Sequence, residues 1–388
     1  MDFTFSPEHI ALRRMIREIS ENEVAPVAAA IDSEHQVPFE TLRILGETGL
    51  LGVCFPQEYG GMGAGETGYC ILMEELGRVC TSTATNVGAH IGIGAMGIYL
   101  DGTEEQKQKY LTPLARGEKI AAFGLTEASA GSDAAAVRTR ATREGDSWFL
   151  DGGKIFITNG GFADIVTVMA VTDPALGARG GITAFIVETD WEGFSVAREE
   201  DKMGIRGTST AELVFNELRV PHENVLGKVG EGFIPFMKSL DMGRLTLGAA
   251  GLGGAQAALE WSVRYAKTRR QFGAEIAHKQ SVQWMIADTA TEVEALRSLI
   301  YRVAWMVDTG QPFAQLAAMA KMYGSQVASR AIDMAVQVHG QLGVSGDYPL
   351  ERAFRDARIA EIFEGTNEIQ RIVIASNIFR EYGVRIRP

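Results

Sequence analysis

The stretch that says most about the fold reads Gly124-Leu125-Thr126-Glu127-Ala128-Ser129-Ala130-Gly131-Ser132-Asp133. It overlaps the apolar run 121–125, which is typical of a short strand. Glycine and other small residues let a ligand approach the backbone closely, and the hydroxyl groups add hydrogen-bond donors. These residues predict a polar loop after a strand, suited to a polar or phosphate-bearing ligand. A simple β-turn is the alternative interpretation of the same residues.

The chain changes character on both sides of this loop. Ser6 and Pro7 suit the cap and the first turn of a helix, and helical periodicity continues to about residue 120. Apolar or alternating runs typical of a small antiparallel sheet follow at 121–125, 148–150, 155–158, 165–171, 182–187 and 212–215. Helical periodicity returns after residue 233. The sequence therefore predicts a mostly helical protein with an N-terminal helical domain (1–120), a middle β domain (121–229) and a C-terminal helical bundle (230–388).

Composition narrows the classes of function. The chain has 388 residues, 46% of them hydrophobic, which is typical of an ordinary globular protein. Its formal net charge of −12 argues against nucleic acid as a general partner. No apolar run reaches membrane-spanning length, so we expect no membrane insertion. The N-terminus resembles neither a signal nor a transit peptide, so we expect a bacterial cytoplasmic chain, or a mitochondrial matrix protein after removal of its leader.

The cysteines and histidines indicate neither a disulfide framework nor a metal centre. Cys54, Cys70 and Cys80 are odd in number and form no Cys-x-x-Cys pair, which indicates a reducing compartment. The histidines are scattered, and none lies four residues from another. We therefore expect no bound metal.

One glycine motif is an expected decoy. Gly92-Ile93-Gly94-Ala95-Met96-Gly97 matches the pattern of dinucleotide-binding folds. Such a fold needs a strand before the motif and a crossover helix after it, whereas this motif lies between helical stretches. Close packing of helices is the preferred interpretation, and we expect no nicotinamide-binding unit.

A second unusual region surrounds Glu364. The run Ile362-Phe363-Glu364-Gly365-Thr366 follows Arg352-Ala353-Phe354-Arg355-Asp356-Ala357-Arg358-Ile359 and precedes Gln370-Arg371-Ile372. With the loop at 124–133, these segments make the chain resemble the acyl-CoA dehydrogenase family along nearly its whole length. The resemblance implies the family's fold: an N-terminal helical domain, a small antiparallel β domain and a C-terminal four-helix bundle. It also implies FAD and α,β-dehydrogenation of a saturated acyl-CoA to the trans-2-enoyl-CoA. Glu364 would remove the α-proton, and hydride would pass to flavin N5.

The resemblance also implies which residues contact FAD. In the family, the segment matching 124–133 wraps the flavin, and the segment matching 154–160 packs an aromatic residue, usually Trp, against it. Phe156 departs from Trp but keeps an aromatic face. Arg269 and Phe272 match residues that reach the FAD of a neighbouring subunit, and Gln341 replaces the Gly or Ser usual in the loop at the adenine end. The expected cofactor-binding residues are Phe123, Leu125, Thr126, Ser132, Phe156, Thr158, Arg269, Phe272, Gln280, Gln337, Gly340, Gln341, Thr366 and Glu368.

The substrate residues come from the same resemblance. Asp241 and Arg244 match positions along the acyl-CoA site, and Ser132 and Gly365 complete the expected substrate-binding set. A minority of the family carries the catalytic Glu at the position of Gly243. Because glycine has no side chain to accept a proton, Glu364 is the expected catalytic base.

Partners and alternatives follow from the family. The resemblance implies electron-transferring flavoprotein as the electron acceptor, a homotetramer, and a role in fatty acid β-oxidation. Chain length argues against the larger acyl-CoA oxidases, and Glu364 argues against a flavin monooxygenase. A non-catalytic flavin-binding scaffold would be expected to lose the base or the flavin loops. A decarboxylating glutaryl-CoA enzyme needs a cation, and residues 81–98 contain no Lys or Arg.

Overall fold

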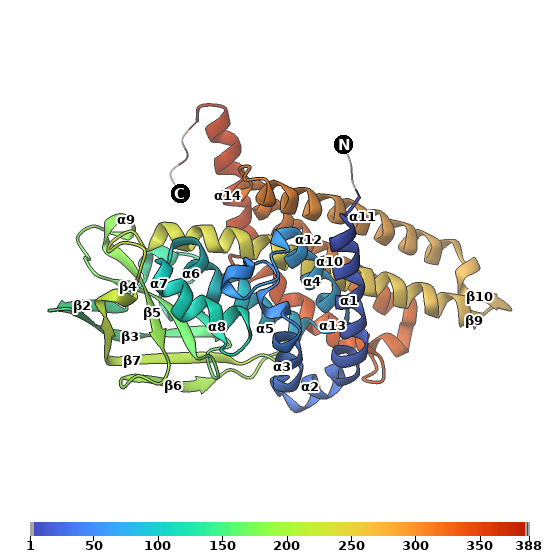
Figure 1. Cartoon of the computed structure of the whole chain (residues 1–388). Helices are drawn as coiled ribbons and strands as arrows, with labels where there is room; N and C mark the ends of the chain where they lie inside the picture. Colours follow the sequence, from blue (N-terminus) through green and yellow to red (C-terminus); the bar gives the residue numbers. More distant parts are fainter. Residues whose placement is uncertain (1–3, 385, 387–388) are drawn as a thin grey trace.

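The computed structural model describes residues 4–384 and 386. Helices precede and follow a β-sheet that forms one end of the molecule (Figure 1). Helix α10 (Phe233–Thr268) runs from this sheet to the opposite end. The predicted order of helical, β and helical regions is confirmed.

The first helix, α1 (Pro7–Ile19), begins as predicted. The hydroxyl of Ser6 accepts a hydrogen bond from the backbone N–H of His9 at 3.2 Å, and Pro7 occupies the first turn. Leu12 and Ile16 bury its inner face. The longer helices before the sheet are α2 (Ala28–Glu34), α3 (Phe39–Glu47), α4 (Gly65–Val79), α5 (Thr81–Gly88), η5 (Ala89–Ala95) and α6 (Met96–Asp101). Shorter ones are η1 (Ser20–Val24), η2 (Ala25–Val27), η3 (Leu50–Gly52), η4 (Gln57–Tyr59), α7 (Glu104–Gln106), η6 (Lys107–Leu111) and α8 (Thr112–Ala115).

The sheet is mixed rather than purely antiparallel. Its strands are β1 (Ala121–Gly124), β2 (Arg140–Glu144), β3 (Ser147–Thr158), β4 (Ile165–Val171), β5 (Ile182–Glu188), β6 (Phe194–Glu199), β7 (Thr210–Pro221) and β8 (Val225–Leu226). Their order is β6-β7-β3-β2-β4-β5-β8, with β1 paired to β4. That last pair is parallel, with Ala121 opposite Ile165, because the chain crosses through β2 and β3 before it returns beside β1. The short helices here are η7 (Ala134–Ala136), α9 (Ala178–Gly181) and η8 (His222–Asn224).

Strand β3 corrects the expectation of two separate strands at 148–150 and 155–158. Gly152 and Gly153 continue the pairing with β7, opposite Phe215 and Val214, so the two runs form one strand. The register shifts on both sides of the glycines, which is where a strand tolerates them. We did not expect β2 and β6, whose residues are mostly exposed and therefore lack an apolar pattern.

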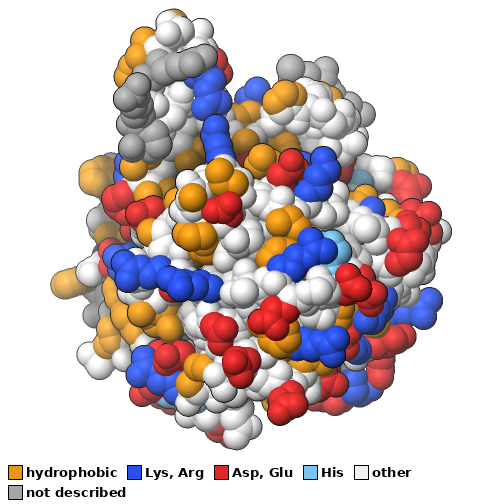
Figure 2. Space-filling view, turned by 90° about the vertical axis from the view of Figure 1, so that its left-hand side faces the viewer, with side chains coloured by type: hydrophobic (Ala, Val, Ile, Leu, Met, Phe, Trp, Pro, Cys, Tyr) orange, Lys and Arg blue, Asp and Glu red, His pale blue; other side chains and the backbone are white. Residues whose placement is uncertain are grey.

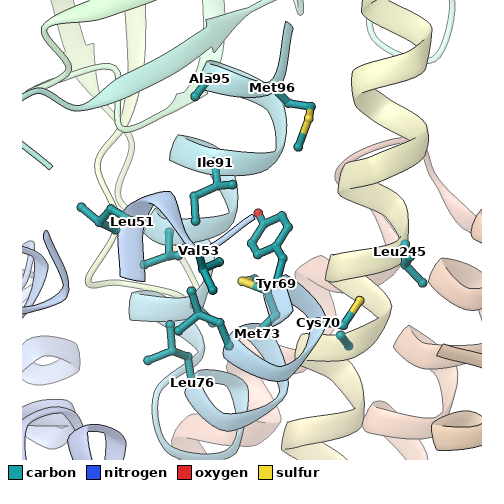
Figure 3. Close-up of a cluster of buried hydrophobic side chains, with 14 of the residues drawn as sticks. Leu51, Val53, Tyr69, Cys70, Met73, Leu76, Ile91, Ala95, Met96 and Leu245 are labelled. Carbon is teal, nitrogen blue, oxygen red and sulfur yellow. The ribbon is translucent and has the colours of Figure 1, made fainter. Parts of the chain in front are cut away.

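The C-terminal region is built on long helices. It contains α10, α11 (Gln280–Asp308), α12 (Ala314–His339) and α14 (Asn367–Glu381), with the shorter η9 (Ile276–His278), η10 (Gly340–Val344), α13 (Pro349–Ala357), η11 (Arg358–Glu361) and the hairpin β9 (Arg270–Gln271) and β10 (Ala274–Glu275). Helix α10 packs against α12 and α11 and also against α4 of the N-terminal region. Figure 3 shows part of this shared core, where Tyr69 of α4 lies among apolar side chains and Leu245 belongs to the neighbouring α10.

The glycine motif at 92–97 packs helices closely, as predicted. A Cβ at Gly92 would lie 2.9 Å from the hydroxyl of Tyr69 and 3.5 Å from Cα of Gly243. A Cβ at Gly94 would lie 2.6 Å from that of Ala121. The glycines therefore let η5 pack closely against α4, α10 and β1.

Candidate active site

Glu364 lies in a strained turn between η11 and α14. Its φ is 51°, in the left-handed region that residues with a side chain seldom adopt, and Gly365 follows with a φ of 87°. Two side chains hold this turn by its carbonyl oxygens. Gln370 Nε2 donates to the carbonyls of Glu364 at 3.1 Å and Gly365 at 3.0 Å, and Lys321 Nζ donates to that of Gly365 at 2.8 Å. The surrounding helices thus impose the conformation of the turn.

The Glu364 carboxylate is poorly solvated. Part of the residue remains at the surface, but Oε2 is buried and has no hydrogen-bond partner among the described residues. Burial raises the pKa of Glu364 to about 7, and the positive charges of Lys321 and Arg244 oppose this rise. A carboxylate with this pKa exchanges protons near neutral pH, as a general base requires.

Helix α10 leaves room for the carboxylate. A Cβ on Gly243 would lie 2.6 Å from Oε2 of Glu364 and 3.3 Å from its Cδ. Because Gly243 has no side chain, the carboxylate can pack directly on the helix backbone. The two positions therefore share one space, and the role of Glu364 as base stays a prediction.

Other polar groups around the turn lack partners. Arg244 is buried, and its Nη1 donates to Oδ1 of Asp241 at 2.6 Å, but its Nε is buried with no partner among the described residues. Gln370 Oε1 is also buried with no hydrogen-bond partner among the described residues. Burial raises the pKa of Asp241, with the charge of Arg244 opposing it. Orphaned buried polar atoms of this kind indicate a place that a polar ligand completes.

The loop after β1 is held rigidly. Lys154, fully buried in β3, donates to Oε1 of Glu127 at 2.6 Å and to the carbonyl of Leu125 at 3.1 Å. Glu127 also accepts hydrogen bonds from the backbone N–H groups of Arg138 and Thr139. The hydroxyls of Thr126 and Thr158 have no hydrogen-bond partner in residues 4–384, so they are free to bind a ligand. Ser132 is exposed further along the loop.

Phe156 presents an aromatic face beside this loop. It lies at a register shift in β3, with a φ of 59°, and 57% of its surface is exposed. An exposed aromatic side chain on a strained backbone destabilises the folded chain, so folding alone does not explain Phe156 at this position. Its ring and the two free threonine hydroxyls match a planar, polar-edged ring system, so this donor set fits the flavin of FAD.

Helix α10 connects the loop with Glu364. Phe123 of β1 stacks on Phe236 of α10 with ring centroids 4.6 Å apart. Gly243, which touches Glu364, follows Phe236 by two helical turns and therefore lies on the same side of α10. The structure thus brings Phe123, one of the expected cofactor-binding residues, and the Glu364 turn to the same side of α10. Thr366 caps α14 by accepting from Ile369, and Glu368 is exposed in the first turn of that helix.

The remaining expected cofactor residues lie at the other end of α10. Arg269 and Gln280 are exposed there, and Phe272 at the tip of the β9–β10 hairpin is 94% exposed, with a φ of 53°. A ring stack between Tyr265 and His339, 4.4 Å apart, brings the segment with Gln337, Gly340 and Gln341 to this end. A helix of 36 residues is about 54 Å long. The structure therefore does not bring this set near Thr126 or Phe156 within one chain.

Two groups that support the site were not identified from the sequence. Lys321 and Gln370 hold the Glu364 turn. Gln370 belongs to a segment that carries the family resemblance, but neither residue was given a role from the sequence. The available signal was a lysine inside an Ala-rich, apolar stretch of α12. In residues 4–384 and 386, no cluster of three His, Cys, Asp or Glu side chains could hold a metal ion. No helix in that part of the chain is long and apolar enough to cross a membrane.

Three family models match consecutive parts of the chain. They describe the acyl-CoA dehydrogenase N-terminal domain at residues 6–118, the middle domain at 122–218 and the C-terminal domain at 230–379. A short-chain specific acyl-CoA dehydrogenase of Clostridium acetobutylicum is 46% identical to this chain, over 98% of this chain and 100% of that protein.

Solved structures agree in fold. Butyryl-CoA dehydrogenase from Megasphaera elsdenii has a TM-score of 0.96 at 41% identity, covering 98% of this chain and 100% of its own. A chain in the structure of the electron transferring flavoprotein of Acidaminococcus fermentans has a TM-score of 0.96 at 45% identity, with the same coverage of both chains. An acyl-CoA dehydrogenase from Bacillus anthracis, complexed with FAD, has a TM-score of 0.91 at 37% identity, covering 98% of this chain and 68% of its own.

Proposed function

The chain belongs to the acyl-CoA dehydrogenase family of FAD-dependent oxidoreductases, and from this we propose that it converts a saturated acyl-CoA to the trans-2-enoyl-CoA. The observation that carries the proposal is the buried, unpartnered Oε2 of Glu364, which lies against the same side of α10 as Phe123 of the strand that leads into the Thr126 loop. Short acyl chains are the first candidates, because one relative is named short-chain specific and one similar structure is a butyryl-CoA dehydrogenase.

Glu364 acts as the base in this proposal. An α-proton beside a thioester is a weak acid, and a well-solvated carboxylate is too weak a base to remove it efficiently. Burial that raises the pKa of Glu364 to about 7 strengthens the base while leaving it ionised at mildly alkaline pH. The backbone N–H of Glu364 would donate to the thioester carbonyl, which favours the developing enolate.

Arg244 and Asp241 position the substrate. Their ion pair, 2.6 Å long, fixes the guanidinium at the Glu364 turn, while Arg244 Nε remains free to donate. Gly365 leaves space for the thioester, and Ser132 on the exposed loop lies along the CoA chain. Arginine suits this position because its fork presents several donors in a fixed plane.

FAD would be held by the residues around Phe156. Thr126 and Thr158 would donate to the ring edge, Phe156 would stack on its face, and Phe123, Leu125, Thr366 and Glu368 would complete the flavin end. Bound FAD would supply the acceptor for the β-hydrogen, which leaves the substrate as hydride. The chain's own contribution is to align the substrate and to exclude water from Glu364.

Assembly into a homotetramer is part of the proposal. Because α10 separates Phe272 from Phe156 by most of its length, Arg269, Phe272, Gln280, Gln337, Gly340 and Gln341 would contact the FAD of a neighbouring copy. Exposed Trp284 and Trp305 on α11 and Ile372 on α14 offer further apolar surface for such contacts.

We also propose electron-transferring flavoprotein as the acceptor and the bacterial cytoplasm as the location. The similarity to a chain in a structure of an electron transferring flavoprotein supports the first, and the bacterial source of that protein and of the other relatives supports the second. Figure 2 shows the face at the β-sheet end, where acidic and basic side chains are interspersed, a surface suited to polar contacts with an acceptor protein.

Anaerobic titration of the flavin spectrum with saturated acyl-CoAs tests this function. Rapid bleaching by one range of chain lengths, with no reduction by free fatty acids, is the expected result. Bound flavin that no acyl-CoA bleaches would contradict dehydrogenation of thioesters. Fast reoxidation of the reduced enzyme by oxygen, with no electron transfer to the flavoprotein, would instead favour an acyl-CoA oxidase.

A further inference from the structure

Lys321 is a fully buried lysine in the first third of α12. Its ammonium donates to the carbonyl of Gly365 at 2.8 Å and to Oδ1 of Asn367 at 3.1 Å. Asn367, the first residue of α14, is held in turn by Ser325 one helical turn further along α12. Lys321 therefore connects α12 to Gly365, within the left-handed turn, and to Asn367, two residues beyond it.

The charge of Lys321 has no direct partner. No carboxylate in residues 4–384 lies within ion-pair distance of its Nζ, and both of its acceptors are neutral oxygens. Burying an ammonium group without a counter-ion is costly, and a neutral donor such as glutamine would satisfy a carbonyl at lower cost. A purely structural bond to Gly365 does not explain a lysine at this position.

The charged groups around the turn act on one another across short distances. Burial lowers the pKa of Lys321 to about 8; the charge of Glu364 opposes the shift, and that of Arg244 reinforces it. More weakly, the carboxylates of Glu361 and Glu368 also favour the charged form of Lys321. Tyr69 faces Glu364 from α4, and burial raises the pKa of that phenol well above its usual value, so it remains neutral. Lys321 and Arg244 are thus the cations that face Glu364 from α12 and α10.

We propose that Lys321 is a positioning residue, which fixes the Glu364–Gly365 turn through the Gly365 carbonyl and favours the carboxylate form of Glu364 through its charge. This inference rests on the proposed role of Glu364 as base. The two effects are separable, because the hydrogen bond needs only a donor whereas the electrostatic effect needs a cation. Arg244 is held by Asp241 and is partly neutralised, so Lys321 supplies the unpaired positive charge.

The test compares Lys321→Gln with Lys321→Met in the purified holoenzyme. Glutamine keeps a donor and loses the charge, whereas methionine loses both. The rate of anaerobic flavin reduction by butyryl-CoA is measured from pH 5.5 to 9.5, with FAD content and melting temperature as folding controls. Removing the charge should raise the apparent pKa of the acid limb by about one unit in both variants, which lowers the rate at pH 6 about tenfold. Methionine should also lower the plateau rate at high pH.

Two further variants make the result decisive. Arg264→Gln removes an exposed positive charge from α10 and should leave the pH profile unchanged. Glu364→Gln reports on the proposed function itself, because retained reduction in that variant would remove the base on which this inference rests. If Glu364→Gln is inactive but both Lys321 variants keep the acid limb of the unsubstituted enzyme, the electrostatic role is overturned. An equal fall in rate at every pH would overturn it as well.

Discussion

A Cβ on Gly243 would lie 2.6 Å from Oε2 of Glu364, an atom that has no hydrogen-bond partner among the described residues. The carboxylate therefore packs against α10 at a position that has no side chain. The two positions belong to α10 and to the turn before α14, which are far apart in the sequence. Their contact means that only one of them can carry the side chain that fills this space. The location of the proposed base is therefore a property of the pair rather than of Glu364 alone.

Gly243→Ala should displace the carboxylate. The new Cβ would be far inside van der Waals contact with Oε2, and the helix backbone of α10 cannot move away because it is packed against η5. A misplacement of about 1 Å commonly costs about a hundredfold in rate, so we expect flavin reduction by acyl-CoA to slow by tenfold to a hundredfold. Stopped-flow reduction of the FAD-loaded variant measures this.

Gly254→Ala is the matched control on the same helix. A Cβ there would have no neighbour closer than 3.9 Å, and alanine favours a helix over glycine by about 1 kcal/mol. This variant should therefore be as active as the unsubstituted protein and slightly more stable. If flavin reduction is equally fast in both alanine variants and in the unsubstituted protein, the Glu364 carboxylate can move away from the new Cβ without loss of activity. That result would contradict the prediction.

Glu364→Gln should abolish reduction while retaining both ligands. The amide has nearly the same shape but cannot accept the α-proton, so we expect a rate at least about a thousandfold lower. Titration with an acyl-CoA, followed by the shift of the flavin absorption, should show binding of similar affinity. Substantial reduction in this variant would remove Glu364 from the role of base.

The same substitution should stabilise the protein in a pH-dependent way. The pKa of Glu364 is raised from 4.5 to about 7 in the folded chain, so the folded state binds the proton more tightly than the unfolded state. Below pH 4.5 both states are protonated and the group has no effect on stability. Between 4.5 and 7 the unfolded chain ionises first, so the stability falls as pH rises, and above 7 the full cost of about 3 kcal/mol remains.

Melting temperatures of the glutamine variant and the unsubstituted protein should therefore converge near pH 4.5 and diverge up to pH 8. Glu66→Gln is the control for burial outside the site. Glu66 is 2% exposed, both of its oxygens lack partners among the described residues, and burial raises its pKa well above the usual value. It should also gain stability at high pH, but with unchanged flavin reduction. A difference in melting temperature that stays constant across pH would contradict the predicted link between the raised pKa of Glu364 and the stability of the folded chain.

The parts of the fold and of the site that the sequence predicts are those whose chemistry shows in local patterns. The cap of α1 at Ser6 and the strand that leads into Thr126 follow from residue order, and the structure confirms both. Family motifs supply the expected position of Glu364. These features depend on neighbours a few residues apart, which a linear pattern records.

The supporting contacts depend instead on packing between distant elements. Lys321 reaches Gly365 across 44 positions of sequence, and nothing in the local pattern of α12 indicates that its lysine points inward. Strand β6 escapes prediction for a related reason, because its mostly exposed residues carry no apolar period and its pairing with β7 is decided by the sheet.

Phe272→Ala should weaken FAD binding without destabilising the chain. The side chain is 94% exposed, so its removal costs little in folding, yet an aromatic contact with a neighbouring copy's cofactor contributes about 1 kcal/mol. We expect the dissociation constant for FAD to rise about fivefold in equilibrium dialysis, with the melting temperature of the FAD-free protein unchanged. Leu176→Ala, an exposed residue near α9 at the sheet end, serves as control. An unchanged constant for Phe272→Ala would remove the hairpin from the cofactor site.

Moving the base to α10 is the most demanding consequence of the Gly243–Glu364 contact. In a Gly243→Glu, Glu364→Gly double variant, the new carboxylate starts from a Cβ that already lies 2.6 Å from the former position of Oε2. Glycine at position 364 also accepts the φ of 51° without strain. We therefore expect flavin reduction at least about tenfold faster than in Glu364→Gly alone, since a general base is worth about a hundredfold or more. Gly243→Gln with Glu364→Gly fills the same space without a base and should show no gain. Equal rates in the Glu and Gln double variants would mean that a carboxylate on α10 cannot reach the α-proton. The contact between positions 243 and 364 would then be a packing contact only.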